Sequence, residues 1–507
     1  MSKTLFQSVL IVAGFTVLTR FLGFLFRIYL SRELGAELLG VYQVAFSVFM
    51  VLTVIVSSGI PLSVSKSTAR FKVDGNKKGE GEIVSSALLV GVLISVVLCS
   101  IILIFHQPIS SLFADERCII ILLTLLPAVI FSAVYSAFRG SMWGSQDYFN
   151  VSLAELVEQV LRIAVFALLA ECLLTSMDGA LLAGWSMSIA CLLSASFVAI
   201  IYFRQGKKLG GPKPMLRPLI KSSAPVTGVR VVSSLIQPVI AVLFPLMLVL
   251  SGYTSEQSME AYGMAMGMTF PLLFLPSTIV GALSFALIPD LSTAIAKKDT
   301  NLIAERVKSS LSFALFVSAL IIPFYMGCGQ EIGLFLYDNA SSGIYLSRAA
   351  WVMVPLGLCN VTSSILNAFN LEVKSFVNNM IGGAVLLLFV VFGSGIMGVD
   401  ALIFGFGGCM TITTILNLIM LKKHTKQEIN LVKPLILMSI FVVPTALLAH
   451  WTFGLLSLCF PVFISLGLCA LLGCGSFVLL CWLFKLVDIT GVMIKFKSNH
   501  KKSKKHA

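Results

Sequence analysis

The chain has 507 residues, of which 58% are hydrophobic and only 12% are charged, and its formal net charge is +13 at pH 7. A soluble domain carries about 25% charged residues, and one water-exposed core stops growing at about 250–300 residues. The composition, with a mean hydropathy of +0.98, therefore excludes a soluble enzyme, a disordered regulator and a secreted disulfide scaffold. It indicates a polytopic membrane protein.

Fourteen apolar segments are long enough to cross a membrane, on the rule that a spanning helix needs about 20 mostly apolar residues. Most connecting segments are short, and the longest ones, 61–82, 204–218 and 289–307, are basic. We therefore expect an all-α integral membrane protein with fourteen transmembrane helices. The predicted spans are 5–30, 38–60, 83–105, 118–138, 152–174, 180–203, 219–250, 261–288, 308–327, 344–369, 376–397, 400–421, 432–453 and 458–486.

Lysine and arginine are distributed unevenly over the segments that connect these spans. With the N-terminus in the cytoplasm, the inside segments hold 29 of the 36 basic residues, whereas the outside segments hold only Arg32, Arg117 and Arg348. Cytoplasmic loops carry an excess of Lys and Arg, and one missed or added helix would invert the pattern. The sequence therefore predicts that both termini lie in the cytoplasm.

The first span carries two arginines. Its apolar stretch continues from Leu5 through Arg20 to Leu30 without a small-residue cleavage site, which indicates a retained helix rather than a signal peptide. Arg20 lies about 22 Å along this helix at ~1.5 Å per residue, and Arg27 follows two turns later on the same face. Arg27 is close enough to the outer end to extend to the interface, but Arg20 is expected to face a cavity or a partner.

The fifth span carries a polar stripe formed by Glu155, Glu158 and Arg162. Their spacing of i, i+3 and i+7 places them on one face of an otherwise apolar helix. A Glu158–Arg162 pair at i, i+4 has the favourable orientation, and this pair alone would give the stripe a structural role. It leaves Glu155 without a partner on its own helix, so we expect the stripe to face a cavity within its lobe rather than lipid.

The seventh span carries Arg230 and Gln237, seven residues apart on one face, and here we favour a functional role. Arg20 and Arg230 occupy related places in the first helices of two lobes. Together with Arg27 they form a candidate cationic cavity for a phosphate-bearing substrate, because guanidinium groups bind phosphate bidentately and keep their charge. A cavity for a cationic drug would instead need carboxylates and aromatic residues, an alternative that the polar stripe keeps open.

The two halves of the chain resemble each other weakly. The second span begins near Gly40-Val41-Tyr42 and leads to Pro61, the eighth begins at Ala261-Tyr262-Gly263 and leads to Pro289, and both enter a basic inside segment. Helices 1–6 therefore match helices 7–12 as a parallel repeat, with a substrate site between the two six-helix lobes. We expect an N-terminal lobe over 1–210, a C-terminal lobe over 211–425, helices 13 and 14 over 426–490, and a basic cytoplasmic tail over 491–507.

Motifs for catalysis or nucleotide binding are absent from the sequence. It contains no G-x-x-x-x-G-K-[ST], H-E-x-x-H or G-x-S-x-G motif, so the chain alone is not expected to hydrolyse ATP. The five histidines are scattered, and the eleven cysteines lie mostly in apolar segments without a C-x-x-C pair, as small buried residues do. We predict a transporter with no catalytic residue, no metal site and no cofactor.

The net positive charge raises nucleic acid as a partner. The basic residues, however, lie in short loops and in the tail without interleaved aromatic residues, so no nucleic-acid partner is expected. Contact of the tail with anionic membrane lipids and a solvated, disordered tail both remain open. The tail lysines are Lys495, Lys497, Lys501, Lys502, Lys504 and Lys505.

Three stretches resemble known flippases. The segment from Pro271-Leu272-Leu273-Phe274 to Ile288-Pro289-Asp290-Leu291 resembles the eighth helix of the stage V sporulation protein B family. Arg139-Gly140, followed by Glu158-Gln159-Val160-Leu161-Arg162, resembles that family's arginine-glycine turn and its E-Q-x-x-R fifth helix. Thr19-Arg20-Phe21-Leu22-Gly23-Phe24 with Arg27 is similar to the first helix of the MurJ lipid II flippases.

The resemblance implies the MATE/MurJ-like fold of the multidrug/oligosaccharidyl-lipid/polysaccharide (MOP) flippase superfamily. It implies a cell-membrane flippase that exports an undecaprenyl-pyrophosphate-linked glycan, a peptidoglycan precursor for the spore cortex, by alternating access. A lipid-linked oligosaccharide is then the substrate, and cell-wall synthesis proteins are candidate partners. The residues expected to bind the substrate are Arg20, Arg27, Arg230, Glu155, Glu158, Arg162 and Gln237.

The sequence departs from the pattern of its relatives at three places. Gly40 stands where MurJ-type proteins have an acidic residue, Ala265 and Met266 stand where they have an arginine, and Trp143 replaces a glutamine near the arginine-glycine turn. These differences favour the sporulation branch and leave the glycan open. Two alternatives also stay open: a multidrug cation antiporter that works through the polar stripe, and a non-transporting membrane scaffold that would tolerate loss of the arginines.

Overall fold

The structure is a computed structural model that describes residues 3–173, 177–297, 299–425, 431–484 and 486, so the basic tail over 491–507 lies outside the described residues. Within these ranges every regular element is a helix. Twelve segments of the described chain are long and apolar enough to cross a membrane, which confirms an all-α membrane fold.

The count of fourteen spans stays a prediction. The first two predicted spans lie in one continuous stretch, Val12–Val73, which counts once among the twelve. The described part of the fifth predicted span, 152–173, lies within Tyr148–Leu173, which is not among the twelve. This helix holds the polar stripe, whose three charged side chains make it more polar than the twelve.

The chain packs as two compact units, unit 1 (Met1–Gly267) and unit 2 (Met268–Ala507). The division falls within a π-helical segment, Gly263–Thr269, whereas the lobes predicted from the repeat meet at 210/211. Compactness and internal repetition are different criteria, so the two divisions need not coincide. The lobe boundaries therefore remain a prediction.

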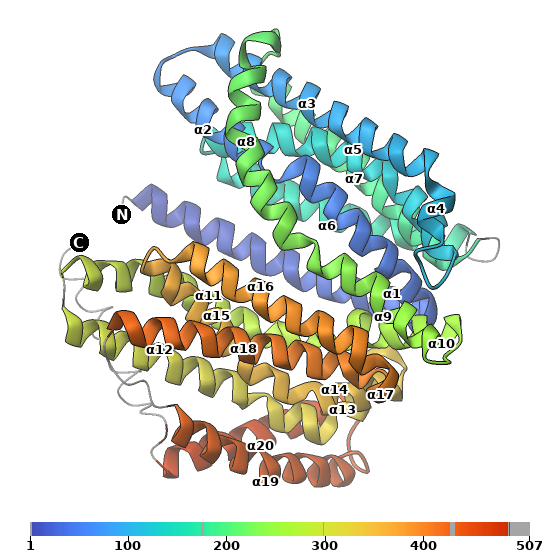
Figure 1. Cartoon of the computed structure of the whole chain (residues 1–507), viewed down its shortest axis with the longest axis vertical. Helices are drawn as coiled ribbons and strands as arrows, with labels where there is room; N and C mark the ends of the chain where they lie inside the picture. The colour runs from blue at the N-terminus through green and yellow to red at the C-terminus, as the bar shows by residue number, and fades with distance from the viewer. Residues whose placement is uncertain (1–2, 174–176, 298, 426–430, 485, 487–507) are drawn as a thin grey trace. The chain divides into compact units, whose positions relative to one another are not determined.

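Unit 1 begins with α1 (Lys3–Ser57), which covers the first predicted span and nearly all of the second and bends sharply at Gly35 (Figure 1). Gly35 has φ 71° and ψ 176°, a backbone conformation that glycine adopts readily because it has no Cβ. The bend ends the first apolar helix and starts the second. It falls in the predicted break between residues 30 and 38.

Nine further helices of the described chain belong to unit 1. The predicted seventh span is formed by two of them, and the break between the two falls at Leu235. Pro238 has no N–H to bond to the carbonyl of Ser234, four residues earlier, and this loss interrupts the helix. The nine helices are α2 (Ile60–Val73), α3 (Lys77–Ile104), α4 (His106–Ser110), α5 (Arg117–Gly144), α6 (Tyr148–Leu173), α7 (Gly179–Arg204), α8 (Lys213–Ser234), α9 (Ile236–Leu250) and α10 (Ser255–Tyr262).

Connecting segments that the charge pattern places in the cytoplasm meet at one end of unit 1, the inner end. Lys72 Nζ, at the end of α2, donates a hydrogen bond to the carbonyl oxygen of Ser145 at 2.8 Å. Lys207 Nζ, just after α7, lies 3.0 Å from Glu80 Oε1 at the start of α3. Three segments that are far apart in the sequence are thereby joined.

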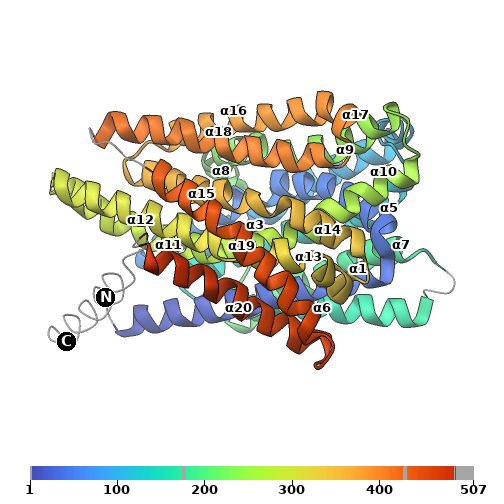
Figure 2. The same cartoon turned by 90° about the horizontal axis from the view of Figure 1, so that it is seen from below.

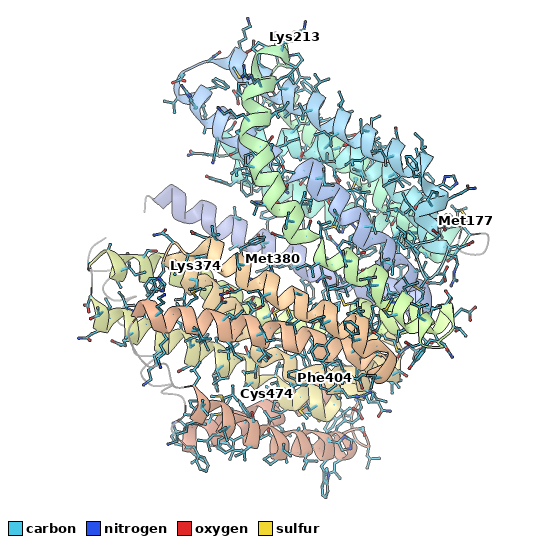
Figure 3. The ribbon with its side chains drawn as sticks, in the orientation of Figure 1. Met177, Lys213, Lys374, Met380, Phe404 and Cys474 are labelled. Carbon is cyan, nitrogen blue, oxygen red and sulfur yellow. The ribbon has the colours of Figure 1, made fainter. Side chains whose placement is uncertain are left out.

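Segments expected outside meet at the opposite end. Ser255 Oγ, at the start of α10, donates a hydrogen bond to the carbonyl oxygen of Ala114 at 2.8 Å, just before α5. Figure 3 shows Lys213 and Met177, which are expected inside and outside respectively, at opposite ends of unit 1. The chain reversals thus agree with the predicted alternation of segments in unit 1, and which end lies in the cytoplasm remains a prediction.

The second half of α1 crosses α10 and the π-helical segment at two glycines. A Cβ on Gly40 would lie 1.9 Å from the carbonyl oxygen of Met259, and a Cβ on Gly263 would lie 1.9 Å from that of Ala36. A side chain on Gly40 would therefore clash with the carbonyl four residues before Gly263, and a side chain on Gly263 would clash with the carbonyl four residues before Gly40. Two elements related by a two-fold axis make reciprocal contacts of this kind.

Unit 2 is helical throughout its described part, and α16 runs beside α18 and α19 beside α20 (Figures 1 and 2). Buried Asn378 on α16 donates a hydrogen bond to Asn417 on α18 at 2.9 Å, and Asn417 donates in turn to Thr362 on α15 at 3.1 Å. A buried polar network whose members are paired fixes the register of the helices that carry it. The helices are α11 (Phe270–Ala296), α12 (Thr300–Leu320), α13 (Ile322–Tyr337), α14 (Ala340–Ala349), α15 (Met353–Ala368), α16 (Glu372–Leu388), α17 (Ser394–Met397), α18 (Asp400–Thr425), α19 (Val432–Leu456) and α20 (Val462–Leu483).

Candidate functional site

A polar cavity of about 170 Å³ lies inside unit 1, between the second half of α1 and helices α2, α5, α6 and α7. The cavity gathers hydroxyl groups and charges, which are costly within a membrane. Its charged members are Arg139 on α5 and Glu158 on α6. The lining residues are Thr53, Ser57, Pro61, Ser132, Tyr135, Ser136, Arg139, Glu158, Cys191 and Ser194.

All three residues of the polar stripe contact other protein groups. Arg162 Nη2 donates to Glu158 Oε1 at 3.0 Å, which is the pair expected within the helix. Glu155 Oε1 lies 3.3 Å from Arg139 Nη1 on α5. The side chains of Glu155, Glu158 and Arg162 are 35%, 25% and 19% exposed. Each carboxylate of the stripe therefore has a guanidinium partner.

Arg139 is the member of this network that the sequence interpretation did not identify. The charge pattern assigns it to an inside segment, but the structure places it in the wall of the polar cavity. Its guanidinium carbon lies 5.8 Å from the ring centroid of Tyr135 and 5.7 Å from that of Trp143, within the range of cation–π interactions. The arginine-glycine pair was the available signal, because a Cβ on Gly140 would lie 2.9 Å from the α-carbon of Pro61 and glycine is needed for the close approach of α5 to α2.

The first half of α1 packs on α6, next to the polar stripe. A Cβ on Gly23 would lie 3.6 Å from Nε2 of Gln159, and the rings of Phe26 and Phe166 meet edge to face with centroids 5.8 Å apart. The span that carries the arginines of α1 therefore contacts the helix that carries the stripe. Sequence spacing alone does not show this pairing.

Of the seven predicted site residues, Glu158 alone lines the polar cavity, and Glu155 and Arg162 lie beside it on the same helix. Arg20, Arg27, Arg230 and Gln237 lie on α1, α8 and α9, and their side chains are exposed. Within the described residues, Arg20 and Arg230 have no hydrogen-bond or ion-pair partner. The structure thus brings Glu155, Glu158, Arg162 and Arg139 together as two neighbouring ion pairs. It leaves Arg20 and Arg230, one in the first helix of each expected lobe, available to a ligand.

This arrangement favours an anionic ligand. An arginine without a protein partner keeps its fork of donors for a bidentate contact with phosphate, whereas a carboxylate already paired with an arginine has little charge left to attract a cation. Among the residues that the structure describes, no three His, Cys, Asp or Glu side chains lie close enough together to hold a metal ion.

Unit 2 contains an apolar groove of about 660 Å³, between α12, α13, α15, α18 and α19. Its walls are almost wholly hydrocarbon, and its hydroxyl groups include those of Thr411 and Ser439. The sequence interpretation did not foresee this groove, because residues from five helices far apart in the chain form it. The apolar lining includes Leu315, Ala319, Met326, Trp351, Leu358, Ile415, Leu418, Leu435, Met438 and Val442.

Comparison with known sequences gives a family and relatives. The family model described as polysaccharide biosynthesis protein matches residues 5–295, more than half of the chain. Stage V sporulation protein B of Bacillus subtilis (strain 168) is 26% identical over 399 residues, which cover 76% of each chain. Lipid II flippase MurJ of the same organism is 22% identical over 478 residues, which cover 86% of each chain.

Comparison with solved structures gives the fold. Lipid II flippase MurJ in its inward closed conformation matches with a TM-score of 0.69 at 14% identity, over 94% of this chain and 98% of that one. A multidrug resistance MATE family transporter of the MOP superfamily, in its inward-facing conformation, matches with a TM-score of 0.67 at 14% identity, over 80% and 94% of the two chains. The expected MATE/MurJ-like fold is confirmed.

Proposed function

Because the chain belongs to the polysaccharide biosynthesis protein family, and is a MOP-superfamily flippase related to MurJ, we propose that it flips an undecaprenyl-pyrophosphate-linked glycan across the cell membrane. The cargo in this proposal is a peptidoglycan precursor for the spore cortex. Similarity to a stage V sporulation protein and to a lipid II flippase supports it. Both termini lie in the cytoplasm, and cell-wall synthesis proteins are the partners that make or consume the precursor.

One observation carries the choice of an anionic cargo. Arg20 and Arg230 have no partner within the described residues, whereas Glu155 and Glu158 are paired with arginines. A pyrophosphate needs cationic donors that are not already neutralised, and these two side chains supply them. Arg27, Arg162 and Gln237 extend the proposed binding surface.

The apolar groove of unit 2 suits the lipid part of this cargo. A prenyl chain gains about 25 cal/mol for each Å² of apolar surface that it buries away from water, but inside a bilayer the gain is smaller because lipid is also apolar. The groove therefore serves to guide the chain while the headgroup moves, rather than to hold it tightly.

Alternating access between an N-terminal lobe over 1–210 and a C-terminal lobe over 211–425 is the proposed mechanism. The reciprocal contact of Gly40 and Gly263 supports the parallel repeat, because each belongs to the corresponding helix of one half. In parallel repeats the substrate site lies between the lobes, and rocking of one lobe against the other opens it to each side in turn. Arg20 and Arg230, in the first helix of each lobe, would then face the substrate from both sides.

Reconstituted vesicles test this function directly. The purified protein is placed in liposomes with a fluorescent undecaprenyl-pyrophosphate-linked glycan, and a membrane-impermeant reductant reports the fraction on the outer leaflet. Wild-type protein and the control Arg204→Ala, which removes an exposed arginine at the inner end, should equilibrate the leaflets, whereas Arg20→Ala should not. Full activity of Arg20→Ala would end the assignment of Arg20, and an inactive wild type would contradict the flippase proposal.

A multidrug cation antiporter is the second candidate, because a MATE family transporter shares the fold. Such a protein would expel an organic cation against a sodium or proton gradient and would need Glu155 or Glu158. Efflux of ethidium that Glu158→Gln abolishes would favour this alternative. A non-transporting scaffold would be indicated if neither cargo moved and loss of the arginines left the cellular phenotype unchanged.

A further inference from the structure

A second polar cavity lies at the inner end of unit 1, and its lining includes none of the arginines that the proposed function uses. It has a volume of about 830 Å³, and its walls come from three connecting segments and the helix ends beside them. The segments are 74–76 between α2 and α3, 145–147 between α5 and α6, and 205–212 between α7 and α8. We call it the inner basic cavity. A volume of this size can hold a small headgroup or a diphosphate.

Direct contacts hold the three segments around this hollow. Lys207 Nζ donates to Ser145 Oγ at 2.6 Å and lies 3.0 Å from Glu80 Oε1. A Cβ on Gly81 would lie 2.3 Å from the carbonyl oxygen of Lys208, so only glycine lets the α7–α8 segment press against α3 here. The Gly210 amide completes the contact by donating to a serine on α3 at 3.1 Å. The walls of the cavity are therefore fixed rather than formed by loose loops.

The lining carries more positive than negative charge. It contains five lysines, Lys72, Lys77, Lys78, Lys207 and Lys208, and two carboxylates, Glu80 and Asp147. Both carboxylates are already engaged by the protein. Glu80 pairs with Lys207, whose side chain is only 16% exposed, and Asp147 Oδ2 accepts hydrogen bonds from Gln205 at 2.6 Å and Asn150 at 2.7 Å.

Four lysines keep their charge for another group. Lys72 donates to a backbone carbonyl, which carries no net charge, and Lys78 lies 4.0 Å from Glu82, at the limit of an ion pair. Lys77 and Lys208 are exposed at the rim and have no ion-pair partner among the described residues. Cytoplasmic lysines are usually spread over the membrane surface, but these four surround one hollow of fixed shape.

We propose that the inner basic cavity is a binding site for a phosphate-bearing anion. Lysine ammonium groups bind phosphate as point charges with several donors each. Glu80 is paired with Lys207, and the other lysines outnumber the one remaining carboxylate, Asp147. The phosphate belongs either to the headgroup of an anionic lipid in the adjacent leaflet or to a free diphosphate in solution. Both sources present the same chemistry to the lysines. This site does not depend on the flippase proposal, because it uses none of the residues assigned to the substrate.

The test compares two double variants with the same change in charge. Lys77→Gln/Lys208→Gln removes two lysines of the cavity. Lys308→Gln/Lys374→Gln removes two exposed lysines of unit 2 that the charge pattern also places inside, of which Lys374 is labelled in Figure 3. Binding of radiolabelled pyrophosphate to each protein in neutral detergent is measured by equilibrium dialysis. Retention of phosphatidylglycerol from mixed phosphatidylcholine nanodiscs is measured by native mass spectrometry.

The site predicts that only the cavity variant loses affinity, by about tenfold or more, which corresponds to roughly 1.4 kcal/mol. Loss of pyrophosphate binding identifies a free phosphate as the ligand, and loss confined to phosphatidylglycerol identifies a lipid headgroup. Equal losses in the two variants, or no binding to the wild type in either arm, would overturn the proposal. Protection of Lys77 and Lys208 from acetylation by added ligand gives a second reading on the wild-type protein, which does not depend on the folding of any variant.

Discussion

The contact between Gly40 and Gly263 predicts a large effect of the smallest possible side chain. In Gly40→Ala the new Cβ would lie 1.9 Å from the carbonyl oxygen of Met259, and ordinary contact begins at 3.4 Å, so the two backbones must separate by about 1.5 Å. Both partners are main chain within helices, and no side-chain rotation relieves the clash. Overpacking of this kind costs about 1–3 kcal/mol. Gly263→Ala should cost a similar amount through its contact with Ala36.

The double variant gives the sharper test of this reasoning. One separation of the two helices relieves both clashes, so Gly40→Ala/Gly263→Ala should cost less than the sum of the single changes. Gly467→Ala on α20 is the matched control, because no atom lies within 4 Å of its added Cβ. In a helix this change is neutral or stabilises by up to roughly 1 kcal/mol.

The free energy of unfolding can be measured for the wild type and the four variants by titration with sodium dodecyl sulfate from mixed micelles. If Gly40→Ala is as stable as the control, the helices do not cross at these glycines. Strict additivity of the two single costs would show that the contacts are independent and not the two halves of one crossing.

Four further predictions address the charges and the topology. Arg20→Lys should restore only part of the flipping lost in Arg20→Ala in the vesicle assay, since lysine lacks the bidentate fork, and full rescue would contradict a bidentate contact. Burial acts to raise the pKa of the Asp115 carboxyl, but hydrogen bonds from Arg117 and its charge, with a hydrogen bond from Ser255, outweigh this and hold the pKa below its ordinary value of 3.8. The stabilisation by Asp115 is therefore fully present above about pH 4 and is lost as the pH falls further. The hydrogen-exchange protection factors at the start of α10, which are corrected for the intrinsic pH dependence of amide exchange, should therefore fall in this range in the wild type but stay unchanged in Asp115→Asn. For the topology, exposed Cys172 and Cys459 are replaced by serine, and single cysteines are introduced at Glu256 and Thr300. These two cysteines should react with impermeant reagents from opposite sides of the membrane. Labelling from the same side would refute the fourteen-helix topology. An inside-negative potential should drive export of the pyrophosphate. Moving its two negative charges outward gains roughly 4.6 kcal/mol per 100 mV, which shifts the distribution between the leaflets by about three orders of magnitude. Flipping rates that do not depend on the sign of a valinomycin potential would exclude this mechanism.

Local and compositional information was sufficient for much of the fold. Apolar length identifies membrane helices because the bilayer demands about 20 apolar residues in a row, whatever the helix packs against. The break at Gly35 falls between two spans that apolar length predicts, whereas the division of the seventh span at Leu235 was not predicted. The Glu158–Arg162 pair follows from helical spacing within one element. The alternation of loops in unit 1 follows from the distribution of lysine and arginine.

Contacts between distant segments were decided only by the tertiary structure. The sequence placed Arg139 in a loop, and the packing of α5 beside α6 made it the partner of Glu155. The polar cavity, the apolar groove and the inner basic cavity each need walls from several helices, and hydropathy does not encode which helices are neighbours. The division into Met1–Gly267 and Met268–Ala507 likewise depends on packing. Within a membrane all these helices present similar apolar faces, so close approach at glycines and a few buried polar pairs select their neighbours.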